Sequence, residues 1–226
     1  PERFRMFLKR YVKEMSQLGV DSVGIVLLIS FFIGAVITIQ LSLNMTSPLI
    51  PRFTIGYSTR EIILLEFSST VMCLILAGKV GSSIASELGT MRVTEQIDAM
   101  EVMGVNSANY LILPKIIGFM LFVPVLSIIS MSTGIVGGYL ACSLVPNLPR
   151  SDFEYGLQLF FSPYNVFYSI IKSVAYAFII SSVAGYYGYT VKGGALQVGK
   201  ASTNAVVQCS ILVLVADLLL TNLLLA

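Results

Sequence analysis

SVGIVLLISFFIGAVITIQLSL, the run from Ser22 to Leu43, decides the fold, because it contains no Lys, Arg, Asp or Glu. About 20 apolar residues, rising 1.5 Å each, cross the roughly 30 Å hydrocarbon core of a membrane. Within lipid, an isolated segment can pair its own backbone polar groups only as a helix. We therefore predict a transmembrane helix at Ser22–Leu43.

Four further apolar stretches have a comparable length and make the chain polytopic. We place them at Ile62–Ile84, Leu111–Leu140, Phe167–Tyr187 and Ala205–Leu225. Of the 226 residues only 12% are charged, whereas a soluble domain keeps about 25% to cover its surface. We predict an all-α membrane protein of about five transmembrane helices, forming a single domain over residues 1–226, with two spans within 22–84 and three within 111–225. The proline-containing segments Asn44–Tyr57 and Val145–Pro163 are expected to be loops.

The N-terminal residues 1–19 combine an apolar stripe at helical spacing with the basic residues Arg5, Lys9 and Lys13 on another face. This pattern favours a helix in the plane of the lipid headgroups, although an ordinary charged flank of the first span is the alternative. The basic cluster places the N-terminus in the cytoplasm. An odd number of spans then puts the C-terminus outside, with Arg52, Arg60 and Arg150 on the outer side.

The most charged connection is Ser86–Gly104, SELGTMRVTEQIDAMEVMG. Thr94 can cap a short helix and Gly104 can end it. Two faces are expected on that helix: an apolar one with Val93, Ile97, Met100 and Met103, and an acidic one with Glu95, Asp98 and Glu101. An amphipathic helix in a cytoplasmic loop suits docking into a partner's groove. From spacing alone, a solvated helix that packs on its own bundle is equally consistent.

Four ionisable residues, Glu66, Lys79, Lys172 and Asp217, lie within or near the apolar spans. Each would cost about 2.5–3.5 kcal/mol if exposed to lipid at mid-helix. We expect them to face the bundle interior or a wet cavity, in pairs. Such a group can line a pathway for a lipid headgroup or form a structural ion pair, and a Lys near a helix end can snorkel.

Several classes of site are disfavoured by composition. The chain has no histidine, which removes the usual general base and the commonest zinc ligand, and its net charge of +2 argues against a nucleic-acid partner. Gly194–Lys200 matches G-x-x-x-x-G-K, but Ala201 replaces the Ser or Thr of a phosphate loop and no strand precedes it. We expect no catalytic residue, metal site or cofactor in this chain.

The run AGKVGSSIASELGTMRVTEQIDAMEVMGV, from Ala77 to Val105, resembles the signature of the MlaE permease family, the membrane subunits of ABC-type phospholipid transporters that work with MCE-domain proteins. The resemblance continues at Lys172, at Lys192–Thr203 and at Val215–Thr221. Lys79 departs from it, because an Arg is common at this position in the family.

The resemblance implies a homodimeric permease, in a bacterial inner membrane, that carries phospholipid through a cavity between its two copies beneath a ring of MCE domains. It also implies that Ser86–Gly104 is a coupling helix in a groove of a cytoplasmic ABC ATPase. The residues expected at that contact are Glu87, Arg92, Glu95, Asp98 and Glu101.

Two other functions remain open from the residues. An ion-coupled secondary transporter of an amphiphilic substrate could use Glu66, Lys172 and Asp217 as relay groups, but it usually shows internal repeats. An intramembrane enzyme acting on lipids is disfavoured, because no acid/base constellation clusters in one segment.

Overall fold

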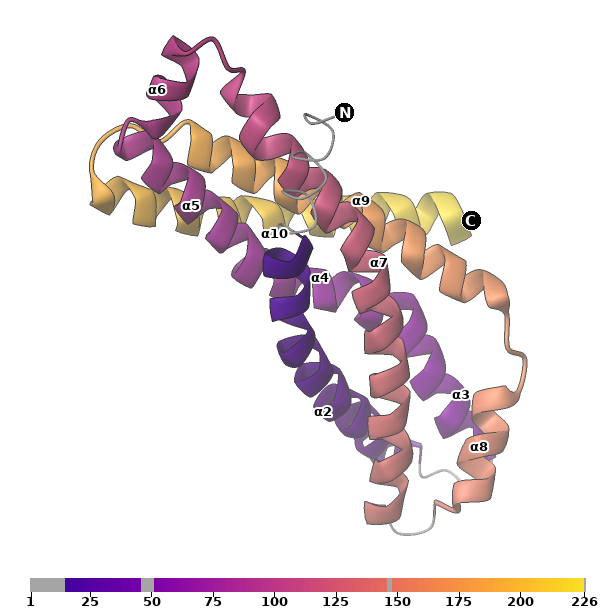
Figure 1. Cartoon of the computed structure of the whole chain (residues 1–226). Coiled ribbons are helices and arrows are strands. Elements are labelled where there is room, and N and C mark those ends of the chain that lie inside the picture. The colour runs from indigo at the N-terminus through magenta and orange to yellow at the C-terminus, as the bar shows by residue number, and fades with distance from the viewer. Residues whose placement is uncertain (1–14, 46–50, 146–147, 226) are drawn as a thin grey trace. The chain divides into compact units, whose positions relative to one another are not determined.

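The computed structural model describes residues 15–45, 51–145 and 148–225, and these contain helices and turns but no strand (Figure 1). Five helical stretches are long and apolar enough to cross a membrane. They are Leu18–Asn44, Phe53–Val93, Ser107–Leu144, Pro163–Tyr189 and Ala195–Leu224. The predicted all-α, five-span architecture is confirmed. The predicted headgroup-plane helix falls mainly on residues 1–14, outside the described part of the chain.

The helical stretches of the first two spans include π-helical segments. A short π-helix, η1 (Ser16–Val20), leads into α2 (Asp21–Asn44). The second span is a continuous series of α3 (Phe53–Ile62), η2 (Ile63–Val71), α4 (Met72–Leu76), η3 (Ala77–Gly81) and α5 (Ser82–Val93), in which η2 and η3 are π-helical. π-helical turns are rare and often occur at functional sites. Here they carry Glu66 and Lys79.

The remaining elements are α6 (Gln96–Val102), α7 (Ser107–Ala141), a 3₁₀ turn η4 (Cys142–Leu144), α8 (Arg150–Gln158), α9 (Pro163–Tyr189) and α10 (Ala195–Leu225). The prediction of a loop over Val145–Pro163 was wrong, because α8 forms within it. Asp152 in the first turn of α8 favours helix formation by complementing the macrodipole. The last helix begins at Ala195, ten residues before the predicted start at Ala205.

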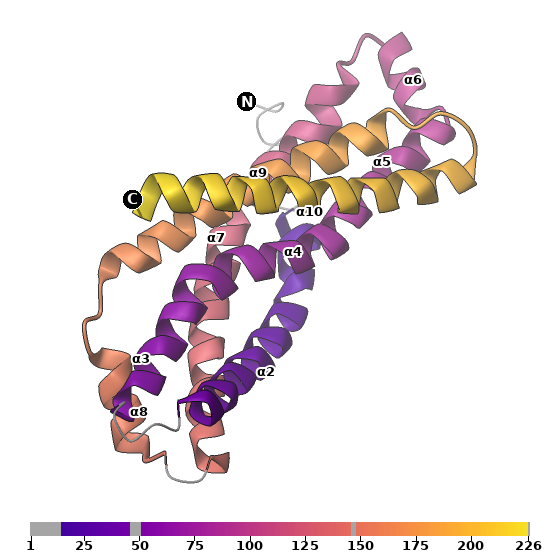
Figure 2. The ribbon, with the colours of Figure 1, turned by 180° about the vertical axis from the view of Figure 1, so that it is seen from behind.

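The chain forms two compact units. Unit 1 comprises the described residues of 1–22, 73–124 and 172–226, and unit 2 comprises those of 23–72 and 125–171. In unit 1, α5 packs against α10. In unit 2, α3 lies beside α8 (Figure 2). The prediction of a single domain over residues 1–226 stays a prediction.

Glycines allow the helices of unit 2 to approach closely. A Cβ added to Gly34 of α2 would lie 1.9 Å from the carbonyl oxygen of Gly134 in α7. The same two helices are joined by a hydrogen bond of 2.8 Å between the hydroxyls of Ser30 and Ser130. A Cβ on Gly56 of α3 would meet the backbone of α8 at 2.4 Å. At these glycines, α2 contacts α7 and α3 contacts α8 through their backbones.

Candidate functional site

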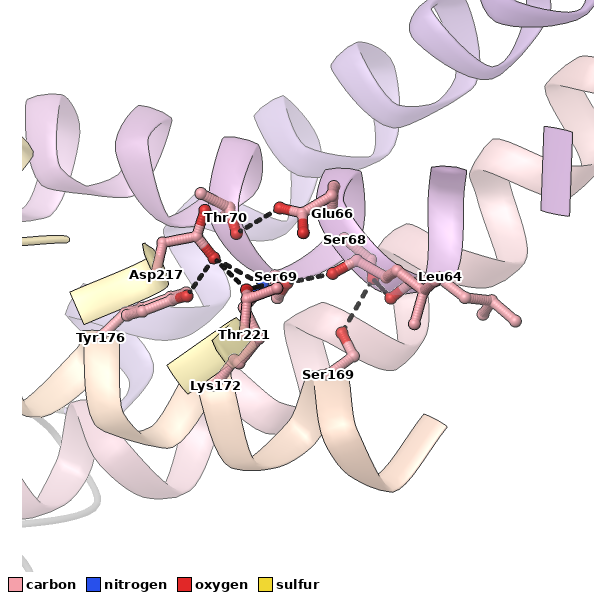
Figure 3. Close-up of polar contacts among 11 residues, drawn as sticks. Leu64, Glu66, Ser68, Ser69, Thr70, Ser169, Lys172, Tyr176, Asp217 and Thr221 are labelled. Carbon is pink, nitrogen blue, oxygen red and sulfur yellow. Dashed lines mark hydrogen bonds and ion pairs between the residues drawn. The ribbon is translucent and has the colours of Figure 1, made fainter. Parts of the chain in front are cut away.

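A buried ion pair joins α9 to α10 in unit 1. The Lys172 ammonium lies 2.5 Å from Asp217 Oδ1, and the Lys172 side chain is fully buried whereas 20% of the Asp217 side chain is exposed. Tyr176 donates to the same Asp217 oxygen at 2.8 Å, and Lys172 also donates to the Thr221 hydroxyl at 3.3 Å. Figure 3 shows these four side chains directed toward one another from the two helices. We call them the Lys172 cluster.

The spacing of the Lys172 cluster explains why it forms. Tyr176 follows Lys172 by four residues and Thr221 follows Asp217 by four, so each pair lies on one face of its helix. A charge buried in a membrane protein is tolerated when it is paired and hydrogen-bonded. The prediction that intramembrane charges form pairs is confirmed for Lys172 and Asp217. Tyr176 and Thr221 were missed, although the four-residue spacing from each charge could have indicated them.

Glu66 lies half-buried in η2, in unit 2. Its Oε2 accepts a hydrogen bond of 3.2 Å from Thr70, one turn later. On another face of η2, the hydroxyls of Ser68 and Ser169 are 3.1 Å apart (Figure 3). Of the buried run Ser68-Ser69-Thr70, only Thr70 bonds the Glu66 carboxylate, and the Ser69 hydroxyl donates to the Leu65 carbonyl. Sequence reasoning missed this run, which stands out as three polar residues within an apolar span.

Lys79 differs from the expectation of an inward-facing charge. Its side chain is exposed, and its ammonium donates to the main-chain oxygen of Asp21 within unit 1. A long Lys that reaches a backbone carbonyl near the end of a span behaves as a snorkelling residue. Of the three predicted pathway residues in unit 1, the structure brings together Lys172 and Asp217 but leaves Lys79 on a different surface.

The charged connection is not one helix over Ser86–Gly104, which corrects the prediction. Ser86–Val93 completes α5, and only Gln96–Val102 forms the separate helix α6. Thr94 does not cap α6, because its hydroxyl bonds back to the Thr90 carbonyl at 2.9 Å, at the C-terminal end of α5. Glu95 instead precedes α6, in a left-handed conformation with φ 59°. Gly104, with φ 74°, follows α6 as expected of a helix stop.

The predicted apolar face of α6 divides between interior and surface, because Ile97 is fully buried whereas Met103 is 70% exposed. Val102, which was not among the residues of that face, is 90% exposed beside Met103. Glu95, Asp98 and Glu101 are all exposed, as the predicted acidic face requires. The tip of α6 therefore presents an apolar pair beside carboxylates.

Glu101 ties α6 to two spans of unit 1. Its Oε1 accepts hydrogen bonds from the Tyr189 hydroxyl of α9 at 2.8 Å and from the Ser107 hydroxyl of α7 at 3.0 Å. The Ser107 and Tyr189 hydroxyls are themselves 2.7 Å apart. Donation by Tyr189, then by Ser107, lowers the pKa of Glu101 below its ordinary 4.5, and Arg92 adds to the effect. We call Glu101, Ser107 and Tyr189 the Glu101 contact.

Two ion pairs reinforce the same end of unit 1. Arg92 of α5 lies 2.5 Å from Asp98 of α6. Lys115 of α7, which is 1% exposed, donates to Glu87 of α5 at 2.7 Å. The structure therefore brings four of the five predicted coupling residues into contacts between α5, α6, α7 and α9. Lys115 was missed by sequence reasoning, because it lies at the start of an apolar span without a charged neighbour in sequence.

Among the described ranges 15–45, 51–145 and 148–225, no three His, Cys, Asp or Glu side chains gather as a metal site would require. The polar groups of the site are instead ion pairs and hydroxyl hydrogen bonds. They join neighbouring helices to one another.

Comparison with known proteins agrees with this architecture. The family described as Permease MlaE matches residues 11–223. A "Probable ABC transporter permease protein" of Rickettsia bellii is 34% identical over 222 residues, covering 96% of this chain and 84% of that protein. A probable ABC transporter permease protein of Synechocystis is 30% identical over 217 residues, covering 96% of this chain and 82% of that protein.

A plant protein is similar over nearly the same region. "Protein TRIGALACTOSYLDIACYLGLYCEROL 1, chloroplastic" of Arabidopsis thaliana is 31% identical over 215 residues, covering 93% of this chain and 60% of that protein. The family match spans all five membrane helices and the α5–α6–α7 connection. The chain therefore belongs to the MlaE permease family and is an integral membrane permease of an ABC transporter.

Proposed function

We propose that this permease moves phospholipid between membranes, driven by ATP hydrolysis in a separate subunit that docks on α6. The observation that carries the proposal is the combination of an exposed apolar tip, Val102 and Met103, with the Glu101 contact behind it. A partner can bind this apolar tip. The Glu101 contact links α6 to α7 and α9, so movement of the bound partner would reach those two spans.

The chemistry of α6 suits a helix-in-groove interface. Such interfaces bury a few apolar anchors surrounded by polar residues. The tip supplies the anchors, and Glu95 and Asp98 supply exposed carboxylates around them. Asp98 is also paired with Arg92, so the docking helix is held at a defined angle to the end of α5. Movement of the ATPase would therefore be passed to the spans rather than absorbed by a loose loop.

The substrate assignment rests on the family and on the Lys172 cluster. A related chloroplast protein bears the name of a galactolipid, trigalactosyldiacylglycerol, which supports a lipid as cargo. Asp217 is partly exposed beside the buried Lys172, so the cluster offers a polar edge within an apolar span. We place this edge along the path of the headgroup, and we propose Glu66 of unit 2 separately as a further pathway residue. Lys79 offers a single exposed ammonium, which cannot form the bidentate phosphate contact of an Arg.

The assembly that we propose follows the family: a homodimer in a bacterial inner membrane, with an MCE-domain protein outside. The N-terminus lies in the cytoplasm and the C-terminus outside. In this orientation α6 faces the cytoplasmic ATPase and α8 faces the MCE protein. The exposed apolar outer faces of α2 and α10, including Phe32 and Leu218, are available to lipid or to a second copy.

The docking role can be tested by co-expression with the ATPase encoded beside the permease. The variant Val102→Asp/Met103→Asp is expected to lose ATPase co-purification and lipid-stimulated ATP hydrolysis. Leu196→Asp is a matched control, because Leu196 is 74% exposed at the start of α10, on the same predicted side of the membrane. Unchanged complex formation and hydrolysis in the double variant would refute the docking assignment. Lipid transport that persists without any ATPase would favour ion coupling instead.

A further inference from the structure

An apolar pocket of about 290 Å³ lies within unit 2, between α3, η2, α7, α8 and the start of α9. Its wall includes Leu64, Met131, Ile135 and Phe161, and its two polar lining residues are Arg60 and Ser132. It contains none of the residues of the Lys172 cluster or the Glu101 contact, so the proposed transport mechanism does not use it.

The polar groups of this pocket are already engaged. Arg60 is 2% exposed and donates from Nη1 to the carbonyl oxygens of Leu157 and Leu159, at 2.7 and 2.8 Å. Its Nε and Nη2 donate to Glu61 at 3.1 and 2.7 Å, and Nη2 also donates to the Phe160 carbonyl at 3.4 Å.

These contacts use all five N–H donors of the guanidinium. The Ser132 hydroxyl donates to the Ile128 carbonyl at 2.9 Å. The pocket therefore has no donor to spare for a phosphate or carboxylate, which selects an apolar ligand.

The position of the pocket indicates where that ligand comes from. Ile128, Ser132 and Phe161 are exposed at its edge, whereas Leu64 and Met131 are buried at its back. Ile128 and Ser132 lie inside the third membrane span, and Val166, another lining residue, lies in the first turn of the fourth. The edge of the pocket therefore lies on the membrane-spanning part of the chain, close to where the fourth span begins.

The volume suits a hydrocarbon chain rather than water. An apolar cavity of about 150 Å³ stays dry and takes up benzene, and this pocket is about twice that size. Where the pocket is unfilled, its apolar lining residues lack dispersion contacts on the side that faces the pocket. We propose that the pocket binds one acyl chain of a phospholipid from the surrounding bilayer, whose headgroup stays at the membrane interface. This inference does not rest on the proposed transport function.

The chain contains no tryptophan, so a single introduced Trp reports on its own surroundings. Phe161→Trp places the reporter in the pocket wall, and Phe167→Trp is the matched control, 65% exposed and outside the pocket. The permease is titrated in dodecyl maltoside micelles with a phosphatidylcholine that carries a dibrominated acyl chain. The fluorescence of the Phe161→Trp variant is expected to fall saturably, with a midpoint at an about ten-fold lower lipid fraction than that of the Phe167→Trp variant.

A pocket-filling substitution separates binding from collision with micellar lipid. Ser132→Phe in the Phe161→Trp background should abolish the saturable quenching, whereas Val136→Phe, on an exposed site outside the pocket, should preserve it. Equal quenching of the two reporters, or saturable quenching that survives Ser132→Phe, would overturn the proposal. Quenching by dibrominated stearic acid but not by the phosphatidylcholine would overturn its phospholipid source.

Native mass spectrometry gives a second measurement that needs no reporter. The otherwise unaltered permease is expected to retain one more phospholipid than its Ser132→Phe variant, and Val136→Phe should match the unaltered protein. Equal lipid retention in all three would also refute the pocket as a lipid site.

Discussion

The Lys172 ammonium and the Asp217 carboxylate lie 2.5 Å apart, with the lysine side chain fully buried. Removing one partner would leave the other as an uncompensated charge among apolar helices. Removing both would leave none, so single and double variants separate the structural role of the pair from its role in transport.

We expect Lys172→Met and Asp217→Asn to be destabilised by about 3–5 kcal/mol each, as is usual for a broken buried pair. The double variant Lys172→Met/Asp217→Asn should recover most of that stability, because no unpaired charge remains. Unfolding in detergent measures both effects. Arg92→Ala serves as the control, since a partly exposed pair contributes about 0–1 kcal/mol.

The double variant then tests the headgroup path. If the Lys172 cluster meets lipid, the folded double variant loses lipid-stimulated ATP hydrolysis in the complex. Hydrolysis at the level of the unaltered protein would show that the Lys172 cluster is a structural ion pair with no role in the lipid path.

Arg60→Lys is expected to destabilise the turn between α8 and α9, although the charge is kept. A lysine has three donors against the five of arginine, and it cannot reach the Leu157, Leu159 and Phe160 carbonyls together. Each hydrogen bond between the guanidinium and one of these partly exposed carbonyls is worth about 1.5–3 kcal/mol. Faster protease cleavage within residues 159–162 would show the effect. Arg150→Lys, at an exposed site, should leave cleavage unchanged.

The pKa of Glu101 should rise when the Tyr189 hydroxyl is removed. The hydrogen bond from that hydroxyl is the largest cause of the lowered pKa of Glu101, and the Glu101 carboxyl lies outside the membrane spans. Carbon-13 titration of the side-chain carboxyl should give a value below 4.5 in the unaltered protein and a higher value in Tyr189→Phe. Tyr186 is 64% exposed and makes no contact with Glu101 among those that lower this pKa, so Tyr186→Phe is the control and should not change it.

The lowered pKa of Glu101 makes the stability of the Glu101 contact depend on pH. A lowered pKa in the folded state means that the Glu101 contact contributes its stability above the ordinary pKa and loses it as pH falls through the lowered value. In Tyr189→Phe that loss should begin at a higher pH. An identical titration in both proteins would contradict the contact.

Gly34→Ala should separate α2 from α7. Its new methyl group would lie 1.9 Å from the Gly134 carbonyl oxygen, so one helix backbone must shift. Overpacking of this kind costs about 1–3 kcal/mol. Gly24→Ala in the same helix meets nothing within 4 Å and should be neutral or stabilising. The midpoint of unfolding in sodium dodecyl sulfate compares them, and equal midpoints would show that the close contact is unimportant.

Glu95→Gly should stabilise α6, because the left-handed backbone at φ 59° costs an L-residue about 1–2 kcal/mol that glycine avoids. The gain should appear as slower hydrogen exchange at the amides of Ala99 and Met103, which close the turns of α6. Glu95→Gln keeps the strained backbone while removing the charge, so its exchange should match that of the unaltered protein. Faster exchange in Glu95→Gly would show that the carboxylate itself holds the helix.

The five spans could be predicted because each is an apolar run of membrane length. Their ends were less predictable, since helices continue into polar residues wherever tertiary contacts stabilise them. The start of α10 shows this, because Ala195 precedes a segment with Gln197, Lys200 and Asn204 that composition alone assigns to a loop. The end of the second span shows the same effect. α5 extends to Val93, where Arg92 pairs with Asp98.

The candidate site was predictable in its charged residues but not in their partners. The intramembrane charges were expected to lie in pairs, but the sequence did not say which would pair, since 45 residues separate Lys172 from Asp217 and nothing local joins them. Arg60 was treated only as a charge outside the membrane. Besides the adjacent Glu61, its partners are main-chain carbonyls about a hundred residues away, which carry no side-chain signal. Contacts of this kind become visible only when the helices are placed.

The close contact of α2 with α7 also constrains how the protein is made. Ser30 finds its partner, Ser130, a hundred residues later in the chain. At about 5–20 residues per second, the first helix therefore waits about 5–20 s in the bilayer before its partner is synthesised. During that interval the glycine and serine surface of α2 lacks the α7 backbone that later packs against it. This is tolerable because the first span is the most apolar of the five. Polar substitutions in α2 should therefore impair insertion before they affect the finished fold.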